Sequence, residues 1–200
     1  MATGLQQMPL FPLSALVLPT VTMPLRIFEQ RYLRLVRDSL RESRPFGVVP
    51  IQAGREVGKA PTIQSWGTVV SIIDWDQRDD GLLGINIRGE QVLHVEESWV
   101  EPDGLMQARV RLYSCDHEDN EQPIPPRFMV LANLLDDLTR HPAASVLRLQ
   151  DGERNLATLG WRLAQLLPVS KQFHQQFLQQ SCPWQRMEML EQAVADINEQ

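Results

Sequence analysis

The sequence MPLFPLSALVLPTVTMPLRIFEQRY, residues 8–32, decides how the N-terminal part of the chain folds. Its apolar runs are only a few residues long because prolines separate them, and the first charged side chain is Arg26. A membrane-spanning helix needs about 20 predominantly apolar residues, and closely spaced prolines break a helix. A signal peptide would begin with basic residues, which this segment lacks. We therefore expect extended core strands, with turns at Pro12, Pro19 and Pro24, in a cytoplasmic protein.

A helix is predicted directly after this segment, from about Ile27 to Ser43. Apolar residues recur at helical spacing on one face, and arginines occupy the opposite face. The apolar face comprises Phe28, Tyr32, Leu35, Val36 and Leu40, and the basic face comprises Arg31, Arg34, Arg37, Arg41 and Arg44. We expect Leu25, Phe28 and Tyr32 to pack this helix against the strands.

The central part of the chain has the period of β-structure. Phe46–Val49 predicts a buried strand, and residues 64–113 predict an antiparallel meander with a hairpin signal at Asp80-Gly81. Within Met106–Leu112 apolar and polar residues alternate, which is typical of a strand with one buried face.

A boundary is predicted at residues 116–126, which are rich in acidic residues and proline. Beyond it the apolar period changes from two to 3.6, and Ser170 is placed to cap a short, glutamine-rich helix near residues 172–180. We therefore predict an α+β chain: a β-rich subdomain over residues 1–115, a linker over 116–126 and a helical subdomain over 127–200. Helical stripes follow Phe128, Leu131, Ala132, Leu135 and Leu138, then Leu156, Leu159, Leu163 and Leu166, then Trp184, Met187, Leu190, Val194 and Ile197.

Composition excludes several functional classes. The 200 residues carry a formal net charge of −6, which disfavours binding to nucleic acid or to a membrane surface. The two cysteines, Cys115 and Cys182, are too few for a disulfide framework and indicate reduced thiols.

Motifs for chemistry are incomplete. Gly54–Lys59 resembles a phosphate-binding loop but has three residues between its glycines, and Ala60 follows where a hydroxyl is needed. Ser65-Trp66-Gly67 lacks the first glycine of a nucleophile elbow. Both segments are therefore interpreted as ordinary structure.

Metal and acid–base sites are likewise not predicted. Cys115 and His117 lack the further ligands that a zinc site requires. Asp74 and Asp76 share one face of a predicted strand, with Trp75 pointing the other way, and are interpreted as a solvated hairpin end. We expect no metal and no cofactor.

Charge is unevenly distributed along the chain. Residues 26–44 contain six arginines against three acidic residues, whereas residues 96–121 contain eight acidic residues against two arginines. The simplest interpretation is a solvated helix face. The alternative is contact with an acidic partner or a second copy of the chain, and such a dimer would weaken at high salt.

The motifs of residues 8–32 resemble the opening signature of the Lon protease N-terminal domain family, although Gln30 stands where that family commonly has proline. Phe46-Gly47, Trp66–Ile72 and Ile85–Gly89 resemble its later strands, and the likeness extends over about residues 8–197. The Ser–Lys protease and ATPase parts of the full enzyme have no counterpart here. The chain therefore resembles the stand-alone bacterial form of this domain.

This resemblance implies a PUA-like β-barrel with one embedded helix, followed by a helical bundle. It also implies a non-catalytic module that binds unfolded polypeptide segments or a protein partner. Glu29 and Arg31 are expected to fix the helix start, and glycines 47, 67 and 89 to allow turns or close backbone approach. Two alternatives stay open: an RNA-binding PUA-like module, and a small hydrolase with an unrecognised site. The candidate binding residues are Arg26, Glu29, Arg31, Tyr32 and Trp66.

Overall fold

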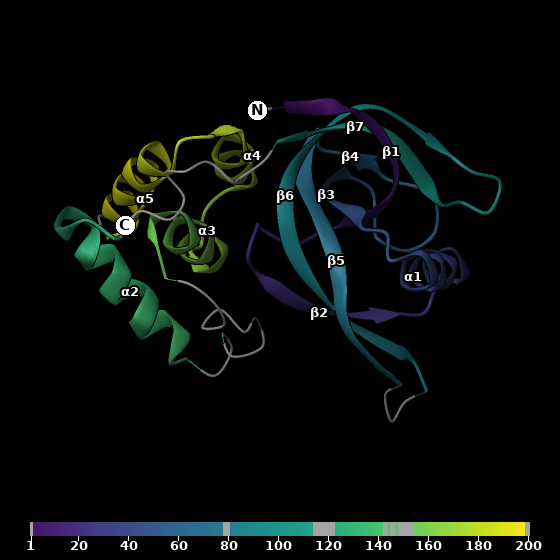
Figure 1. Cartoon of the computed structure of the whole chain (residues 1–200), viewed down its shortest axis with the longest axis horizontal. Helices are drawn as coiled ribbons and strands as arrows, with labels where there is room; N and C mark the ends of the chain where they lie inside the picture. The colour runs from purple at the N-terminus through teal and green to yellow at the C-terminus, as the bar shows by residue number, and fades with distance from the viewer. Residues whose placement is uncertain are drawn as a thin grey trace.

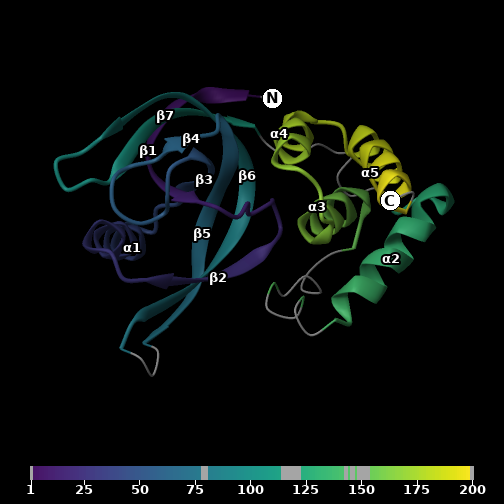
Figure 2. The ribbon, with the colours of Figure 1, turned by 180° about the vertical axis from the view of Figure 1, so that it is seen from behind.

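The computed structural model describes residues 2–77, 81–113, 123–141, 144, 147 and 154–198. Figure 1 shows two lobes side by side, and Figure 2 shows the same arrangement from behind. We call residues 2–113 the β lobe and residues 123–198 the helical lobe. The predicted linker, residues 116–126, lies mostly outside the described residues, as do Asp80, Cys115 and His117, so the division of the chain stays a prediction.

The β lobe is built on one mixed, mostly antiparallel sheet. The strand order is β1-β7-β6-β5-β3-β4, and β1 also pairs with β3 in parallel, so five strands form a closed circuit of pairings. The strands are β1 (Ala2–Leu13), β2 (Thr22–Ile27), β3 (Phe46–Ala53), β4 (Thr62–Ile63), β5 (Trp66–Gln77), β6 (Leu83–Val100) and β7 (Met106–Tyr113).

The long strand β6 joins two parts of this sheet. Its first residues pair with β2 on one side and with the end of β5 on the other, while its later residues pair with β7. In Figure 1 the ends of β5 and β6 project from the lobe as a hairpin beyond β2. The pairing between β5 and β6 shifts between Ile72 and Asp74, which leaves Ile73 as an extra residue in a bulge.

The described residues form five α-helices, and side-chain caps mark the starts of two of them. Ser170 caps α4 by accepting from the Phe173 amide, as predicted, and Asn155 forms a capping box with Thr158 at the start of α3. The helices are α1 (Gln30–Glu42), α2 (Met129–Thr139), which follows the 3₁₀ turn Pro126–Phe128, α3 (Leu156–Leu166), α4 (Lys171–Gln179) and α5 (Pro183–Asn198).

Three apolar clusters form the core. One holds Tyr32, Leu35 and Val36 of α1 against β-strand residues, which confirms that the helix packs on the sheet. A second lies within the sheet, and a third spans both lobes. Burial at these sites is the main favourable contribution to folding, about 1.5–3 kcal/mol for each large side chain.

The expected face of α1 was partly wrong. The helix begins at Gln30, not Ile27, because Phe28 and Glu29 remain in the extended segment that follows β2. Phe28 therefore leaves the apolar face and is 52% exposed. Arg31, expected on the solvent side, is 6% exposed because its guanidinium has internal partners.

The prediction of turns at Pro12 and Pro24 was also wrong. Pro12 pairs with Val49 inside the sheet, and Pro24 pairs with Asn86 within β2. Proline can occupy these places where its nitrogen has no ladder bond to make, as on an edge strand. Close backbone approach was predicted correctly for Gly67 and Gly89, because a Cβ there would collide with the carbonyl oxygens of Val48 and Leu18.

Candidate functional site

Three of the five candidate residues meet at the start of α1. The Arg31 guanidinium pairs with the Glu29 carboxylate at 3.0 Å and donates to the carbonyl oxygens of Gly104 and Glu56 at 3.1 and 3.2 Å. Glu56 in turn accepts from the Ser14 amide at 2.6 Å. The pair therefore holds together the segments before α1, around Glu56 and around Gly104, which is a structural role of the kind predicted for Glu29 and Arg31.

Tyr32 completes this buried group. Its ring stacks on Phe11, with 4.1 Å between the ring centroids, and the Arg31 guanidinium lies 4.6 Å from the Tyr32 ring centroid. Burial raises the pKa of Tyr32 to about 12. With its side chain 5% exposed, Tyr32 offers little surface to a partner.

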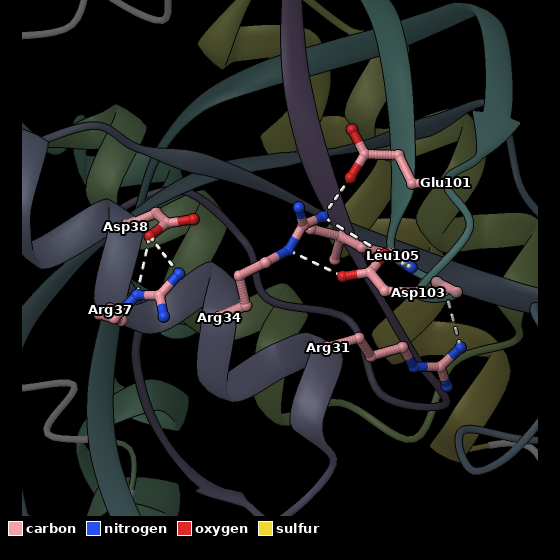
Figure 3. Close-up of polar contacts among 8 residues, drawn as sticks. Arg31, Arg34, Arg37, Asp38, Glu101, Asp103 and Leu105 are labelled. Carbon is pink, nitrogen blue, oxygen red and sulfur yellow. Dashed lines mark hydrogen bonds and ion pairs between the residues drawn. The ribbon is translucent and has the colours of Figure 1, made fainter.

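Arg34, one turn further along α1, points toward the turn between β6 and β7 (Figure 3). Its guanidinium pairs with the carboxylates of Glu101 and Asp103, and the Asp103 contact is 2.8 Å. The hydrogen bond to Glu101 raises the pKa of Arg34 above its ordinary value. The basic helix and the acidic segment therefore meet within one chain. The charges of Arg34, Glu101 and Asp103 are paired with each other and are not left for a partner or a second copy.

Arg37 and Arg41 of α1, and Arg44 just after it, have acidic neighbours on the same segment. Arg37 pairs with Asp38, and both Arg41 and Arg44 pair with Glu42, at 2.9–3.3 Å. These pairs are exposed and contribute little to stability. They also lower the net charge that the helix presents to a second copy, and the predicted salt-sensitive dimer stays a prediction.

Arg26 and Trp66 lie outside the cluster of Glu29, Arg31 and Tyr32. Arg26 is exposed on β2, opposite Gly84 of β6. Trp66 begins β5. The centroid of its ring lies 4.7 Å from the His94 ring centroid and 5.1 Å from the Tyr113 ring centroid. The structure thus brings together three candidate residues and separates two.

A hollow of about 330 Å³ lies on the three-stranded part of the sheet formed by β2, β6 and β5. Gly84, which lies between Arg26 and Asp76 in the pairing register, contributes no side chain to it. Asn86 donates to Asp74 at 3.3 Å beside it. The hollow is lined by Pro24, Leu25, Asp74, Asp76, Gly84, Ile85 and Asn86.

Three exposed apolar side chains lie on or next to the same strands: Ile73 and Trp75 on β5, and Phe28 directly after β2. Trp75 is 59% exposed, Ile73 48% and Phe28 52%. Trp75 pairs with Ile85, whereas Asp74 and Asp76 pair with Asn86 and Gly84, so the predicted opposition of Trp75 to the two carboxylates is confirmed. We call Phe28, Ile73 and Trp75 the hairpin surface. The alternation of residues 74–76 was visible in the sequence, but the bulge that exposes Ile73 was not.

Two features bear on whether the described residues could carry chemistry: the metal-ligating side chains and the loop over residues 54–59. In the described part of the chain, no group of three His, Cys, Asp or Glu side chains is arranged to hold a metal ion. The glycines of the loop that resembles a phosphate-binding loop, Gly54 and Gly58, have φ of +106° and +93°. These left-handed conformations allow the loop to turn back so that its Glu56 meets Arg31, which supports the interpretation of ordinary structure.

Comparison with known proteins identifies the family. Residues 7–196 match the family described as the substrate-binding domain of the ATP-dependent protease La (LON). The chain belongs to this family. Membership in the Lon substrate-binding family confirms the resemblance inferred from residues 8–32.

Individual relatives agree with this assignment. The crystal structure of a Lon N-terminal domain protein from Xanthomonas campestris is 34% identical, with a TM-score of 0.70, and the match covers 92% of this chain and 96% of that one. The N-terminal domain of a Mycobacterium avium complex Lon protease shares the fold at 16% identity, with a TM-score of 0.61 and coverage of 96% and 99%.

A Lon protease from Cytophaga hutchinsonii is 30% identical over 116 residues, which are 56% of this chain. The match covers only 14% of that protease, so the activity of the whole protease is not transferred to this chain. In the ranges that the structure describes, no helix has both the length and the apolar character needed to cross a bilayer.

Proposed function

We propose that this chain is a non-catalytic, cytoplasmic module that binds unfolded polypeptide segments or an exposed segment of a protein partner, in the manner of a stand-alone bacterial Lon-type domain. The observation that carries the proposal is the match to the substrate-binding family over residues 7–196. The closed circuit of β1, β7, β6, β5 and β3 supports the finer expectation of a PUA-like barrel followed by a helical bundle.

The hairpin surface is the proposed contact site. Phe28, Ile73 and Trp75 are each about half exposed, although large apolar side chains are usually buried. Aromatic side chains of this kind dominate the energy of many protein interfaces. Among the five candidate residues, only Arg26 is exposed, and it lies on β2, one of the three strands of this part of the sheet, whereas Arg31 and Tyr32 are buried and stabilise the fold.

Magnitudes predict a weak interaction. Complete burial of a large apolar side chain is favourable by about 1.5–3 kcal/mol, and these three side chains have about half of that still to gain. Their sum is about 2–4.5 kcal/mol. Because association itself costs free energy, the dissociation constant is expected to be millimolar or weaker. Weak contact suits a module that samples many unfolded chains, and several contacts on one chain would strengthen it.

The test is a binding titration with a permanently unfolded probe, reduced and carboxymethylated lactalbumin, followed by NMR chemical shifts. We expect shifts at Ile73 and Trp75, and at least fivefold weaker binding for the double variant I73S/W75S. The matched control is V130S, because Val130 is 74% exposed in the helical lobe. Absence of binding at millimolar probe would overturn the proposed function, and equal losses in both variants would remove the hairpin surface from it.

In the residues that the structure describes, we find no observation that favours the RNA-binding or the hydrolase alternative.

A further inference from the structure

The glutamine-rich helix α4 contacts the first residue of β5 through the side-chain amide of Gln175. Gln175 donates from Nε2 to the Trp66 carbonyl oxygen at 3.0 Å, and its Oε1 accepts from the Trp66 amide at 3.3 Å. The side-chain amide thus satisfies both backbone groups of one residue, as a neighbouring β-strand would.

A second glutamine makes an equivalent contact from another helix. Gln165 of α3 donates from Nε2 to the Leu16 carbonyl oxygen at 2.8 Å, and its Oε1 accepts from the Leu18 amide at 3.0 Å. Leu18 is fully buried, so its amide has no access to water without this partner. Lys171 adds a longer contact, from Nζ to the Ile51 carbonyl oxygen at 3.4 Å.

Beside these polar contacts, the described residues of the two lobes share an apolar junction. Leu16, Leu18, Val21 and Val92 of the β lobe belong to the same buried cluster as the residues of α2–α5. Apolar contact is favourable but has little directional preference, so it holds the lobes together without fixing their rotation. Hydrogen bonds are directional and weaken steeply when their angles change.

Because the apolar contacts are not directional and the hydrogen bonds are, we propose that Gln165 and Gln175 determine the orientation of the helical lobe relative to the β lobe. Each glutamine makes a two-bond contact, and the contacts are on different helices and on different segments of the β lobe. These four hydrogen bonds at two separate places, together with the apolar contact, define one relative orientation of the lobes. Without them, the apolar junction persists and the helical lobe samples a range of orientations.

One strand, β5, connects the contact made by Gln175 with the hairpin surface. Trp66, which Gln175 holds, is the first residue of β5, and Ile73 and Trp75 lie near its other end. The glutamines therefore fix where the helical lobe stands relative to the hairpin. The inference itself does not depend on what the hairpin surface binds.

The first test measures amide hydrogen exchange by NMR in the full chain. In Q175A we expect exchange of the Trp66 amide to accelerate about tenfold, and in Q165A that of the Leu18 amide, as expected for loss of one hydrogen bond. The matched controls are Q172A and Q176A, which change exposed glutamines of the same helix α4. Unchanged exchange at both amides would overturn the proposal.

The second test measures the distance between the lobes by electron–electron double resonance. Spin labels are placed at Gln30 and Ala195, both exposed, in a background with both cysteines replaced by serine. We expect a broadened distance distribution in Q165A/Q175A, with a cooperative unfolding transition retained. If the double variant unfolds, the single variants are measured, each with partial broadening expected. A distribution as narrow as in the parent protein would overturn the proposal.

Discussion

The buried guanidinium of Arg31 donates to the carbonyl oxygen of Gly104, 3.1 Å away, and thereby ties the first turn of α1 to the turn between β6 and β7. Gly104 has a φ of +88°, which glycine tolerates without strain. A residue interpreted from sequence as part of a solvated basic face is therefore an internal connector between three segments.

Replacement of Arg31 should be strongly destabilising. R31A leaves Glu29 without its buried partner and two carbonyl oxygens without their donor, so we expect the free energy of unfolding to fall by about 3 kcal/mol. R31K should recover only part of this, since an ammonium group lacks the planar fork. Urea unfolding is the measurement, with R37A as the control: Arg37 is 68% exposed, and its loss should cost less than about 0.5 kcal/mol. Equal effects of R31A and R37A would contradict the assigned role.

A single methyl group at Gly67 should also be costly. The added Cβ would collide with the Val48 carbonyl oxygen in the neighbouring strand, so β3 and β5 must separate locally. We expect G67A to lower the free energy of unfolding by about 1–3 kcal/mol. G4A is the matched control, because a Cβ on Gly4, also in a strand, would meet no atom within 4 Å. Thermal unfolding of the two variants distinguishes the outcomes, and a G67A as stable as G4A would show that the strands can adjust freely.

Alkaline pH should destabilise the protein through Tyr32. Its pKa rises from 10.0 to about 12 on folding, so the folded state keeps the phenol protonated where the unfolded chain releases the proton. This contribution is fully present below pH 10 and is lost as the pH rises toward 12, amounting to about 2–3 kcal/mol. Ultraviolet titration of Y113F isolates the Tyr32 phenol, and ionisation near pH 10 in the folded state would contradict its burial.

Acid should weaken the helical lobe through His174. This side chain bonds the Ala164 carbonyl oxygen at 3.1 Å, and burial lowers its pKa from the ordinary 6.5. The unfolded chain therefore binds a proton more readily, and the stability contribution present above pH 6.5 declines as the pH falls below it. We expect H174Q to show a smaller loss of stability between pH 7.5 and pH 5 than the parent protein. Parallel pH profiles of the two proteins would show that another group is responsible.

The sequence predicted the order of elements better than their faces. Strict alternation in β7 and the helical period of α1 and α3 are local properties, and both appear in the structure. The position of Phe28 was wrong because the helix starts three residues later than its apolar spacing suggested. Burial of Arg31 depends on Glu56 and Gly104, which are distant in sequence, so no local pattern announces it.

The candidate site was predicted less well for a related reason. Glu29, Arg31 and Tyr32 stand out in sequence because they belong to the signature, yet they stabilise the fold. Ile73 lies at a shift in strand pairing, and the hollow is lined by Gly84, which lies between Arg26 and Asp76. Both follow from how three strands align, which a single sequence does not specify.

The free borders of the sheet carry obstacles to further pairing. β2 pairs only with β6 and contains Pro24, β4 has two residues, and β5 is interrupted at Ile73 where β3 no longer accompanies it. A straight row of vacant backbone donors is what seeds fibrillar aggregation. In the described part of the sheet, an unfolded client that contacts Trp75 would meet only short or interrupted borders, and we expect it to be released as a single chain without having nucleated amyloid on its host.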